Sequence, residues 1–209
     1  MKKFVRVMSA AMSAALVLTA LAGCGGSDSA KTFTVGFDAE YPPYGYRTES
    51  GDYAGFDLDL AAEVCERNGW ELVKQPIDWD AKDMELSSGA IDCIWNGFTI
   101  REDLKESIDF SNAYCKNMQV AVIKAENSGK YTDLASLAKA NIVAEAGSSG
   151  ESAVADCEEL KECNYVGVSK MADALLEVKA GTADAAVVDY VMAKAMVGEG
   201  TDYSDLQIV

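Results

Sequence analysis

The amino-acid sequence predicts an α/β fold with two lobes, built on mostly parallel sheets that are flanked by helices. Strand-like and helix-like segments alternate along the chain after residue 32, which is typical of α/β proteins. The chain also repeats itself: ELSSGAIDCIWNG (85–97) and EVKAGTADAAVVD (177–189) share a helix end, a glycine, an aspartate and an apolar strand. This repeat, which aligns Asp92 with Asp184, favours two similar lobes over a single sheet.

The first half of the chain is predicted to contain three strands and two helices. Apolar runs bounded by turn residues indicate strands at FTVGFD (33–38), ELVKQPI (71–77) and IDCIWNGF (91–98). The first helix begins at Phe56, carries an apolar stripe of Phe56, Leu60 and Val64, and stops at Gly69. The second is the short segment AKDMELSSG (81–89).

The second half continues the alternation with four strands, at MQVAVIK (118–124), NIVAEA (141–146), YVGVS (165–169) and ADAAVVDY (183–190). A helix is predicted at DLASLAKA (133–140), capped by Thr132, with Leu134, Leu137 and Ala138 on one face. Another follows the turn at 147–150. A third, KMADALLEVKAG (170–181), has a buried stripe of Met171, Leu175 and Val178.

Residues 1–23 have the layout of a secretory signal, because three basic residues precede an apolar stretch that ends in small residues. The LAGC at 21–24 looks like a bacterial lipobox, in which cleavage leaves Cys24 as a lipidated first residue. The alternative is an ordinary signal followed by a chance cysteine. Residues 24–32 are predicted to form a flexible tether. We therefore expect an extracytoplasmic protein, anchored to the cell membrane by lipid.

The formal charge of the chain is −16, and removal of the three basic residues of the leader makes it −19. Such a protein lacks the basic footprint that nucleic acids require. The absence of histidine argues against a Ser-His catalytic pair and a histidine-containing zinc site, and we expect no metal or cofactor. Five cysteines follow Cys24, and the closest pair, Cys157 and Cys163, is left open between a disulfide and free thiols.

Polar residues follow four predicted strands at their carboxyl ends, which is where open α/β sheets bind ligands. They lie at Asp38, 96–99, 146–149 and Asp189. Ser149 stands at a strand-to-helix turn, where a serine acts as a nucleophile, caps the helix, or holds an anion. The nucleophile is disfavoured, because the chain lacks histidine and does not match the G-x-S-x-G pattern. The other two roles are compatible with each other.

Five segments carry a resemblance to extracellular solute-binding protein family 3, the polar amino acid receptors of ABC importers. They are VGFDAEYPPYGY, GDYAGFDLDLAAEVC, AIDCIWNGFTI, IDFSNAY and AGTADAAVVD. The resemblance implies a clamp of the periplasmic-binding-protein fold, type II, with lobe 1 at 33–115 and lobe 2 at 116–205. Residues 206–209 would begin the return crossover, and the rest of lobe 1 is expected to be missing through a C-terminal truncation.

The resemblance implies that Asp189 holds the α-ammonium group of an amino acid and that Ser149 holds its α-carboxylate. The alternative for Asp189 is a helix cap before YVMAKAM. The arginine that clamps the carboxylate in this family aligns with Leu104, and the nearest arginine is Arg101. Whether Arg101 replaces it is left open, because bidentate carboxylate recognition is hard to replace.

Five further residues have implied contacts with the ligand. Asn96, Gly97 and Thr99 would meet its backbone, and Asp38 and Tyr41 would line the side-chain pocket, unless Tyr41 only packs a rigid loop.

Trp79 and Lys82 lie in a loop that would also reach this pocket. Trp79 and Trp95 are more simply explained as core residues, and Lys82 as a solvated side chain.

These features together predict a non-enzymatic, monomeric substrate-binding component of an ABC importer, which captures a free polar amino acid by lobe closure and delivers it to the permease. One alternative is a ligand-sensing ectodomain of the same fold. Another is a lyase or dehydratase acting on small acids, with Glu40 or Glu145 as the acid. The sequence leaves the amino acid open, since Asp38 favours a basic or amide side chain and Lys82 an acidic one.

Overall fold

The structure, a computed structural model, describes residues 30–209. The expected leader and Cys24 lie outside the described residues. Among the residues that are described, no helix is long and apolar enough to cross a membrane.

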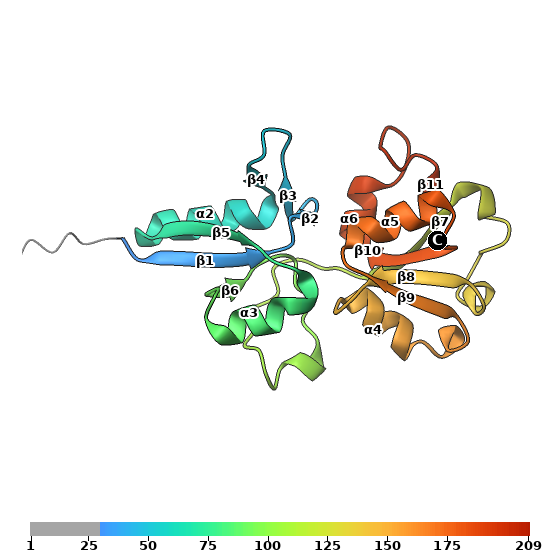
Figure 1. Cartoon of the computed structure of the whole chain (residues 1–209), viewed down its shortest axis with the longest axis horizontal. Helices are drawn as coiled ribbons and strands as arrows, with labels where there is room; N and C mark the ends of the chain where they lie inside the picture. The colour runs from blue at the N-terminus through green and yellow to red at the C-terminus, as the bar shows by residue number, and fades with distance from the viewer. Residues whose placement is uncertain (1–29) are drawn as a thin grey trace, which may run out of the picture. The chain divides into compact units, whose positions relative to one another are not determined.

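The first lobe contains a parallel sheet with strand order β5-β1-β6, formed by β1 (Thr32–Phe37), β5 (Glu71–Pro76) and β6 (Cys93–Ile94). Helices α2 (Phe56–Asn68) and α3 (Lys82–Ser88) lie on opposite faces of this sheet (Figure 1). The sequence did not predict a small antiparallel sheet beside it, made of β2 (Glu40–Tyr41), β3 (Gly45–Arg47) and β4 (Tyr53–Ala54). Two 3-10 turns, η1 (Trp79–Ala81) and η2 (Glu102–Leu104), complete the lobe.

The second lobe is built on a five-stranded sheet with order β11-β7-β10-β8-β9. Its strands are β7 (Gln119–Lys124), β8 (Asn141–Glu145), β9 (Asn164–Val168), β10 (Ala185–Asp189) and β11 (Leu206–Ile208). Strand β8 is parallel to β9 and β10, whereas β7 runs antiparallel to both of its neighbours. The two main sheets are therefore mostly parallel, as the alternation predicted.

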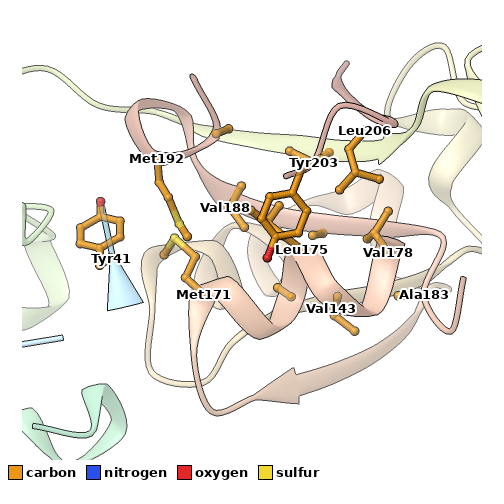
Figure 2. Close-up of a cluster of buried hydrophobic side chains, with 14 of the residues drawn as sticks. Tyr41, Val143, Met171, Leu175, Val178, Ala183, Val188, Met192, Tyr203 and Leu206 are labelled. Carbon is orange, nitrogen blue, oxygen red and sulfur yellow. The ribbon is translucent and has the colours of Figure 1, made fainter. Parts of the chain in front are cut away.

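Helices cover both faces of the five-stranded sheet (Figure 1). Helix α5 (Met171–Ala180) and helix α6 (Tyr190–Met196) pack on one face, and α4 (Ser149–Asp156) packs on the other. Because side chains alternate along a strand, Val188 of β10 joins the α5 face and Val187 joins the α4 face. The predicted stripe of α5 is confirmed, since Met171, Leu175 and Val178 are all buried in the cluster shown in Figure 2.

The repeat predicted between residues 85–97 and 177–189 has a structural counterpart. Helices α3 and α5 both end at a left-handed glycine. The aspartate that follows then binds the start of the neighbouring strand: Asp92 Oδ2 accepts the Thr34 N–H at 2.7 Å, and Asp184 Oδ2 accepts the Asn141 N–H at 2.9 Å. The two segments therefore connect helix to strand in the same way in each lobe.

The predicted helix at 133–140 is wrong, because only the 3-10 turn η4 (Ala135–Leu137) forms there. Thr132 does not cap it. Instead the Ser136 hydroxyl accepts the N–H groups of Thr132 and Asp133, and the Asp133 carboxylate accepts the Ser136 N–H. Such local side-chain bonds compete with helical hydrogen bonding. Leu134, expected on the inner face, is 49% exposed.

Helix α2 faces its sheet differently from the prediction, since Phe56 is 49% exposed. The buried apolar residues are Leu58, Ala61 and Cys65. Asp57 accounts for this orientation, because its carboxylate accepts hydrogen bonds from the Gly97 N–H and the Tyr114 hydroxyl and is fully buried. Because the Asp57 carboxylate must reach these two hydrogen-bond donors, the face of α2 that carries Asp57 points toward them.

Cys157 and Cys163 flank the 3-10 turn η5 (Glu158–Leu160) and pack against the core on the α4 face. Both are free thiols, as are the other cysteines in the described part of the chain. Burial raises the pKa of the Cys163 thiol.

Asp184 should contribute measurably to stability. Its carboxylate also accepts hydrogen bonds from the hydroxyl of buried Tyr131 at 2.6 Å and from Asn141 Nδ2 at 3.2 Å, so Asp184→Ala leaves three donors without this acceptor. The free energy of unfolding should fall by on the order of 1–3 kcal/mol, measured by urea denaturation. The exposed Asp205 is the control, and Asp205→Ala should change it by less than about 0.5 kcal/mol. Equal effects of the two variants would contradict the repeat's structural role.

Candidate functional site

A small pocket lies where the carboxyl ends of β1, β6, β8 and β10 meet, and residues from both lobes line it. Seven of the eight residues predicted to bind ligand are in its lining: Asp38, Tyr41, Asn96, Gly97, Thr99, Ser149 and Asp189. The cavity has a volume of about 20 Å³, enough for about one water molecule. An amino acid is larger, so the lobes must move apart to admit one.

The ends of β1 and β6 are tied together by Asn96. Its side-chain Oδ1 accepts the Asp38 N–H at 3.0 Å, and Asp38 Oδ1 in turn accepts the Glu40 N–H at 2.8 Å. The other carboxyl oxygen of Asp38 is buried and has no hydrogen-bond partner among the described residues. Burial raises the pKa of Asp38 to about 6.

Gly97 gives the β6 end its tight turn, with φ of +56°, a conformation that favours glycine. An added Cβ would lie 3.0 Å from the Tyr44 ring. The Gly97 N–H donates to the Asp57 carboxylate, so the loop that lines the pocket is held by a buried acid in the first turn of α2. Burial raises the pKa of Asp57 to about 6. Asp57 was not predicted from the sequence, although its place among apolar residues was a signal.

The aromatic ring of Tyr41 lines the pocket and packs against residues of the second lobe. Its ring stacks on Tyr44 with centroids 5.2 Å apart and an interplanar angle of 27°. Both tyrosines belong to the same buried cluster as Met171 of α5, and Figure 2 shows Tyr41 and Met171 in this cluster. The Tyr41 hydroxyl is buried without a hydrogen-bond partner among the described residues. Burial, and then the negative charge of Asp189, raise the pKa of Tyr41.

At the start of α4, helix capping and contact with the pocket, which the sequence assigned to Ser149 alone, fall to two different serines. Ser148 is the N-cap, and its hydroxyl accepts the N–H groups of Gly150 at 3.1 Å and Glu151 at 3.2 Å. Ser149 is the first helical residue and lines the pocket. The preceding Gly147 has φ of +69°, which permits the sharp turn from β8. Capping therefore falls to Ser148, which leaves Ser149 beside the positive end of the helix dipole.

Asp189 ends β10 and precedes α6, but its side chain does not cap that helix. Its Oδ1 accepts hydrogen bonds from Asn117 Nδ2 and from Gln119 Nε2, the latter at 2.7 Å. Burial raises the pKa of Asp189, while the nearby Tyr41 hydroxyl and these two amides favour its charged form. The two amide residues were missed by the sequence analysis, because only the β7–β10 pairing brings them to Asp189.

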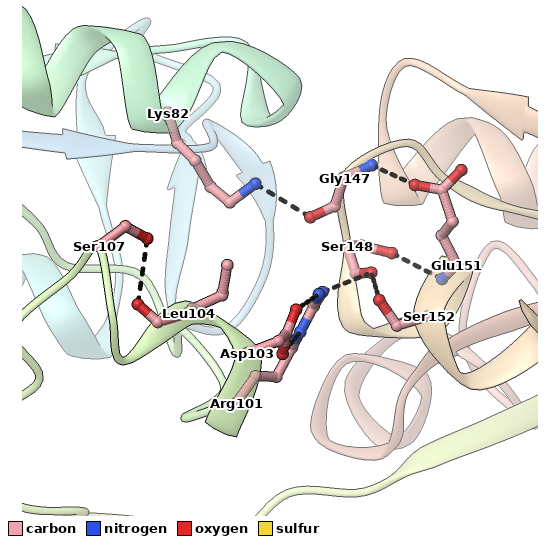
Figure 3. A network of polar contacts seen from close by, with 9 residues as sticks. All are labelled: Lys82, Arg101, Asp103, Leu104, Ser107, Gly147, Ser148, Glu151 and Ser152. Atoms are coloured by element: carbon pink, nitrogen blue, oxygen red, sulfur yellow. Dashed lines mark hydrogen bonds and ion pairs between the residues drawn. The ribbon is translucent and has the colours of Figure 1, made fainter. Parts of the chain in front are cut away.

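Two cations from the first lobe reach the carbonyl groups that precede α4 (Figure 3). Lys82 is 4% exposed, which corrects the expectation of a solvated side chain, and its Nζ donates to the Gly147 oxygen at 3.0 Å. Burial lowers the pKa of Lys82. Arg101 donates to the Ser148 oxygen at 3.5 Å, but its guanidinium is forked onto Asp103, with Nε to Oδ1 at 3.1 Å. It does not line the pocket.

Glu145, at the end of β8, is the unexpected member of the pocket lining. It is 3% exposed, and Oε1 has no hydrogen-bond partner among the described residues. Burial raises the pKa of Glu145 to about 9; the charges of Asp38 and Asp189 add to this shift and Lys82 opposes it. From the sequence, Glu145 was considered only as a possible catalytic acid.

Residues 33–194 match the family model of bacterial extracellular solute-binding proteins, family 3. The chain belongs to this family. Relatives include the arginine-binding extracellular protein ArtP of Bacillus subtilis, which is 25% identical over 194 residues that cover 90% of this chain and 75% of ArtP. A solved substrate-binding protein of an ABC uptake transporter, from Streptococcus pneumoniae with bound histidine, has a TM-score of 0.74 and 36% identity, covering 85% of this chain and 73% of that chain.

The relatives of this solute-binding protein also include an enzyme. Cyclohexadienyl dehydratase of Pseudomonas aeruginosa is 27% identical over 105 residues, which cover 50% of this chain and 39% of the dehydratase. Most of the similar proteins are nevertheless binding proteins, and the two-lobed fold is shared with them.

The stability of this solute-binding protein should depend on pH through Glu145. In the folded protein the Glu145 carboxyl group keeps its proton up to about pH 9, whereas its ordinary pKa is 4.5. Between these pH values the folded state therefore binds more protons than the unfolded state. The free energy of unfolding should therefore fall as pH rises from about 4.5 to about 9, by at most about 1.4 kcal/mol per pH unit from this group.

Urea denaturation at several pH values measures this slope. Glu145→Gln should flatten it, whereas Glu126→Gln, at an exposed position, should keep it. A slope that persists unchanged in Glu145→Gln would mean that Glu145 is ionised in the folded protein.

Proposed function

We propose that this chain is the substrate-binding component of an ABC importer, which captures a free polar amino acid between its lobes and delivers it to the permease. The observation that carries the proposal is the pairing, in one pocket, of a buried carboxylate, Asp189, with the N-terminus of α4 at Ser149. These groups have the opposite charges to the two ends of a zwitterion. The amino acids named for the relatives add support.

In this proposal Asp189 accepts hydrogen bonds from the α-ammonium group. Asn117 and Gln119 both bond its Oδ1, so they fix the carboxylate and leave Oδ2 to the ligand. The α-carboxylate is bound by Ser149 and the first turn of α4, because helix N-termini attract anions. Burying a zwitterion is tolerable only when both charges have partners.

The first lobe supplies the rest of the contacts in this proposal, with Asn96, Gly97 and Thr99 against the ligand's backbone. A ligand that touches both lobes favours the closed arrangement by the free energy of those contacts. Direct contacts between the lobes, such as the Lys170–Glu40 ion pair and the Lys82 hydrogen bond to Gly147, would also form on closure.

Replacing Asp189 should abolish most of the binding. Asp189→Asn keeps the shape but removes the charge that partners the α-ammonium group, and loss of one member of a buried charge pair costs about 2–5 kcal/mol. A thermal-shift screen of the twenty amino acids and cystine first selects the ligand. Isothermal titration calorimetry with that ligand should then show an affinity that is lower by roughly thirtyfold or more. Asp205→Asn is the matched control and should bind normally. Normal binding by Asp189→Asn would refute the proposed role.

Arg101 should contribute little to affinity. Its guanidinium is already forked onto Asp103 and lies outside the pocket lining, so we propose that α4, rather than an arginine, provides the main contact to the carboxylate. Arg101→Ala and Asp103→Ala should each change the dissociation constant by less than about threefold, which is about 0.7 kcal/mol. If Arg101→Ala weakened binding and Asp103→Ala strengthened it, Arg101 would instead leave Asp103 to bind the ligand.

We also propose that the mature protein acts as a monomer outside the cytoplasmic membrane and is tethered there by lipid on Cys24. The lipobox-like LAGC and the tether composition support this. Cys24→Ser should release the protein from the membrane fraction of producing cells, and retention of the variant there would contradict the anchor.

A second candidate function is elimination from a small acid, favoured by the neutral carboxyl group that the raised pKa of Glu145 provides inside the pocket and by the dehydratase relative. Turnover assays with small hydroxy acids distinguish the two functions. We expect no product from the purified protein, and product formation that Glu145→Gln abolishes would establish the enzyme instead.

A further inference from the structure

The pocket has more negative charge than the two ends of an amino acid require. Asp38, Glu145 and Asp189 line it, and no lysine or arginine does. In the proposed binding mode Asp189 is matched by the ligand's α-ammonium group, and the α-carboxylate is matched by α4. The carboxyl groups of Asp38 and Glu145, one from each lobe, then have no partner from the ligand's backbone.

Neighbouring protein groups do not supply that partner. One oxygen of each carboxyl, Asp38 Oδ2 and Glu145 Oε1, is buried without a hydrogen bond to any described residue. The charge of Lys82 acts on Glu145 and that of Lys170 on Asp38. Lys82 Nζ, however, donates to the carbonyls of Trp79 and Gly147, and Lys170 is paired with Glu40, so neither lysine forms an ion pair with these acids in the described structure. Two buried acids that act on each other are costly unless one of them keeps its proton or something positive binds between them.

We propose that Asp38 and Glu145 form a subsite for a positively charged side chain, so that the ligand is a basic amino acid. This inference rests on the proposed function and specifies its substrate class. Arginine fits best, because its guanidinium has five N–H donors in a plane and can bond two carboxylates at once. The aromatic rings of Tyr41, Trp79 and Phe98 also line the pocket, and flat guanidinium groups stack well on such rings.

Glu145 must be ionised to hold this cation, so binding should release its proton. Burial and the charges of Asp38 and Asp189 favour the protonated form of Glu145, whereas Lys82 and the backbone N–H of Met171 favour the ionised form. A bound guanidinium adds a positive charge and lowers the pKa of Glu145. The affinity for arginine should therefore rise with pH up to about pH 9.

Calorimetric titration of the purified full chain with arginine and citrulline tests the subsite, because citrulline has nearly the shape of arginine without its charge. Arginine should bind roughly tenfold to hundredfold more tightly, as expected for charge-assisted hydrogen bonds. Glu145→Gln should lower the affinity for arginine by a similar factor and leave that for citrulline within about threefold. Glu126→Gln is the exposed control and should match the unmodified protein.

Titrations at pH 7.5 in two buffers of different ionisation enthalpy measure proton release. Arginine should release up to one proton from the unmodified protein and clearly less from Glu145→Gln, a difference that a purely structural role of Glu145 would not produce. If citrulline or glutamine bound as tightly as arginine, the subsite would be refuted while the proposed function stood. If none of the twenty amino acids or cystine bound, the proposed function would fail, and the subsite with it.

Discussion

The structure of the pocket depends on the cost of burying carboxyl groups where parallel strands end. The carboxyl ends of β1, β8 and β10 place Asp38, Glu145 and Asp189 in one cavity. Each acid removed from water must gain hydrogen bonds, gain a cation, or keep its proton. The three acids differ in this respect: two side-chain amides donate to Asp189, the Glu40 N–H donates to Asp38, and Glu145 keeps its proton.

The opposite side of the pocket is positive for a different reason. The first turn of α4 supplies a helix dipole, and Ser148 fixes its geometry by capping. Lys82 and Arg101 reach the carbonyls just before this turn from the other lobe. Their charges reinforce the positive end of α4 without entering the cavity, and they can do so only when the lobes are together. In the proposed binding mode this would couple closure to anion binding, mainly through Lys82, because Arg101 is already paired with Asp103.

Much of this arrangement was predictable from the sequence. The alternating segments, together with the repeat of residues 85–97 at 177–189, located the strand ends. The glycine–serine turn before α4 located the helix N-terminus. These features depend on local chemistry and on a general rule for sheets. The resemblance to the family then singled out residues such as Tyr41 and Asp189, which local patterns alone would have left as a packing residue and a cap.

What was missed depends on contacts between distant parts of the chain. Asp57 was not predicted to have a structural role, yet its carboxylate accepts the N–H of Gly97, forty positions away. Lys82 looked solvated, yet a carbonyl from the other lobe and two aromatic rings enclose it. The helix expected at 133–140 does not form, because the Ser136 side chain makes local hydrogen bonds that compete with it. The spacing of apolar residues gives no sign of these bonds.

A crystal structure of the protein grown with arginine tests the central claim most directly. We expect the α-ammonium group within hydrogen-bond distance of Asp189, the α-carboxylate at Ser149, and the guanidinium between Asp38 and Glu145. Arginine bound outside this pocket, or inside it with the carboxylate facing Asp189, would contradict the account.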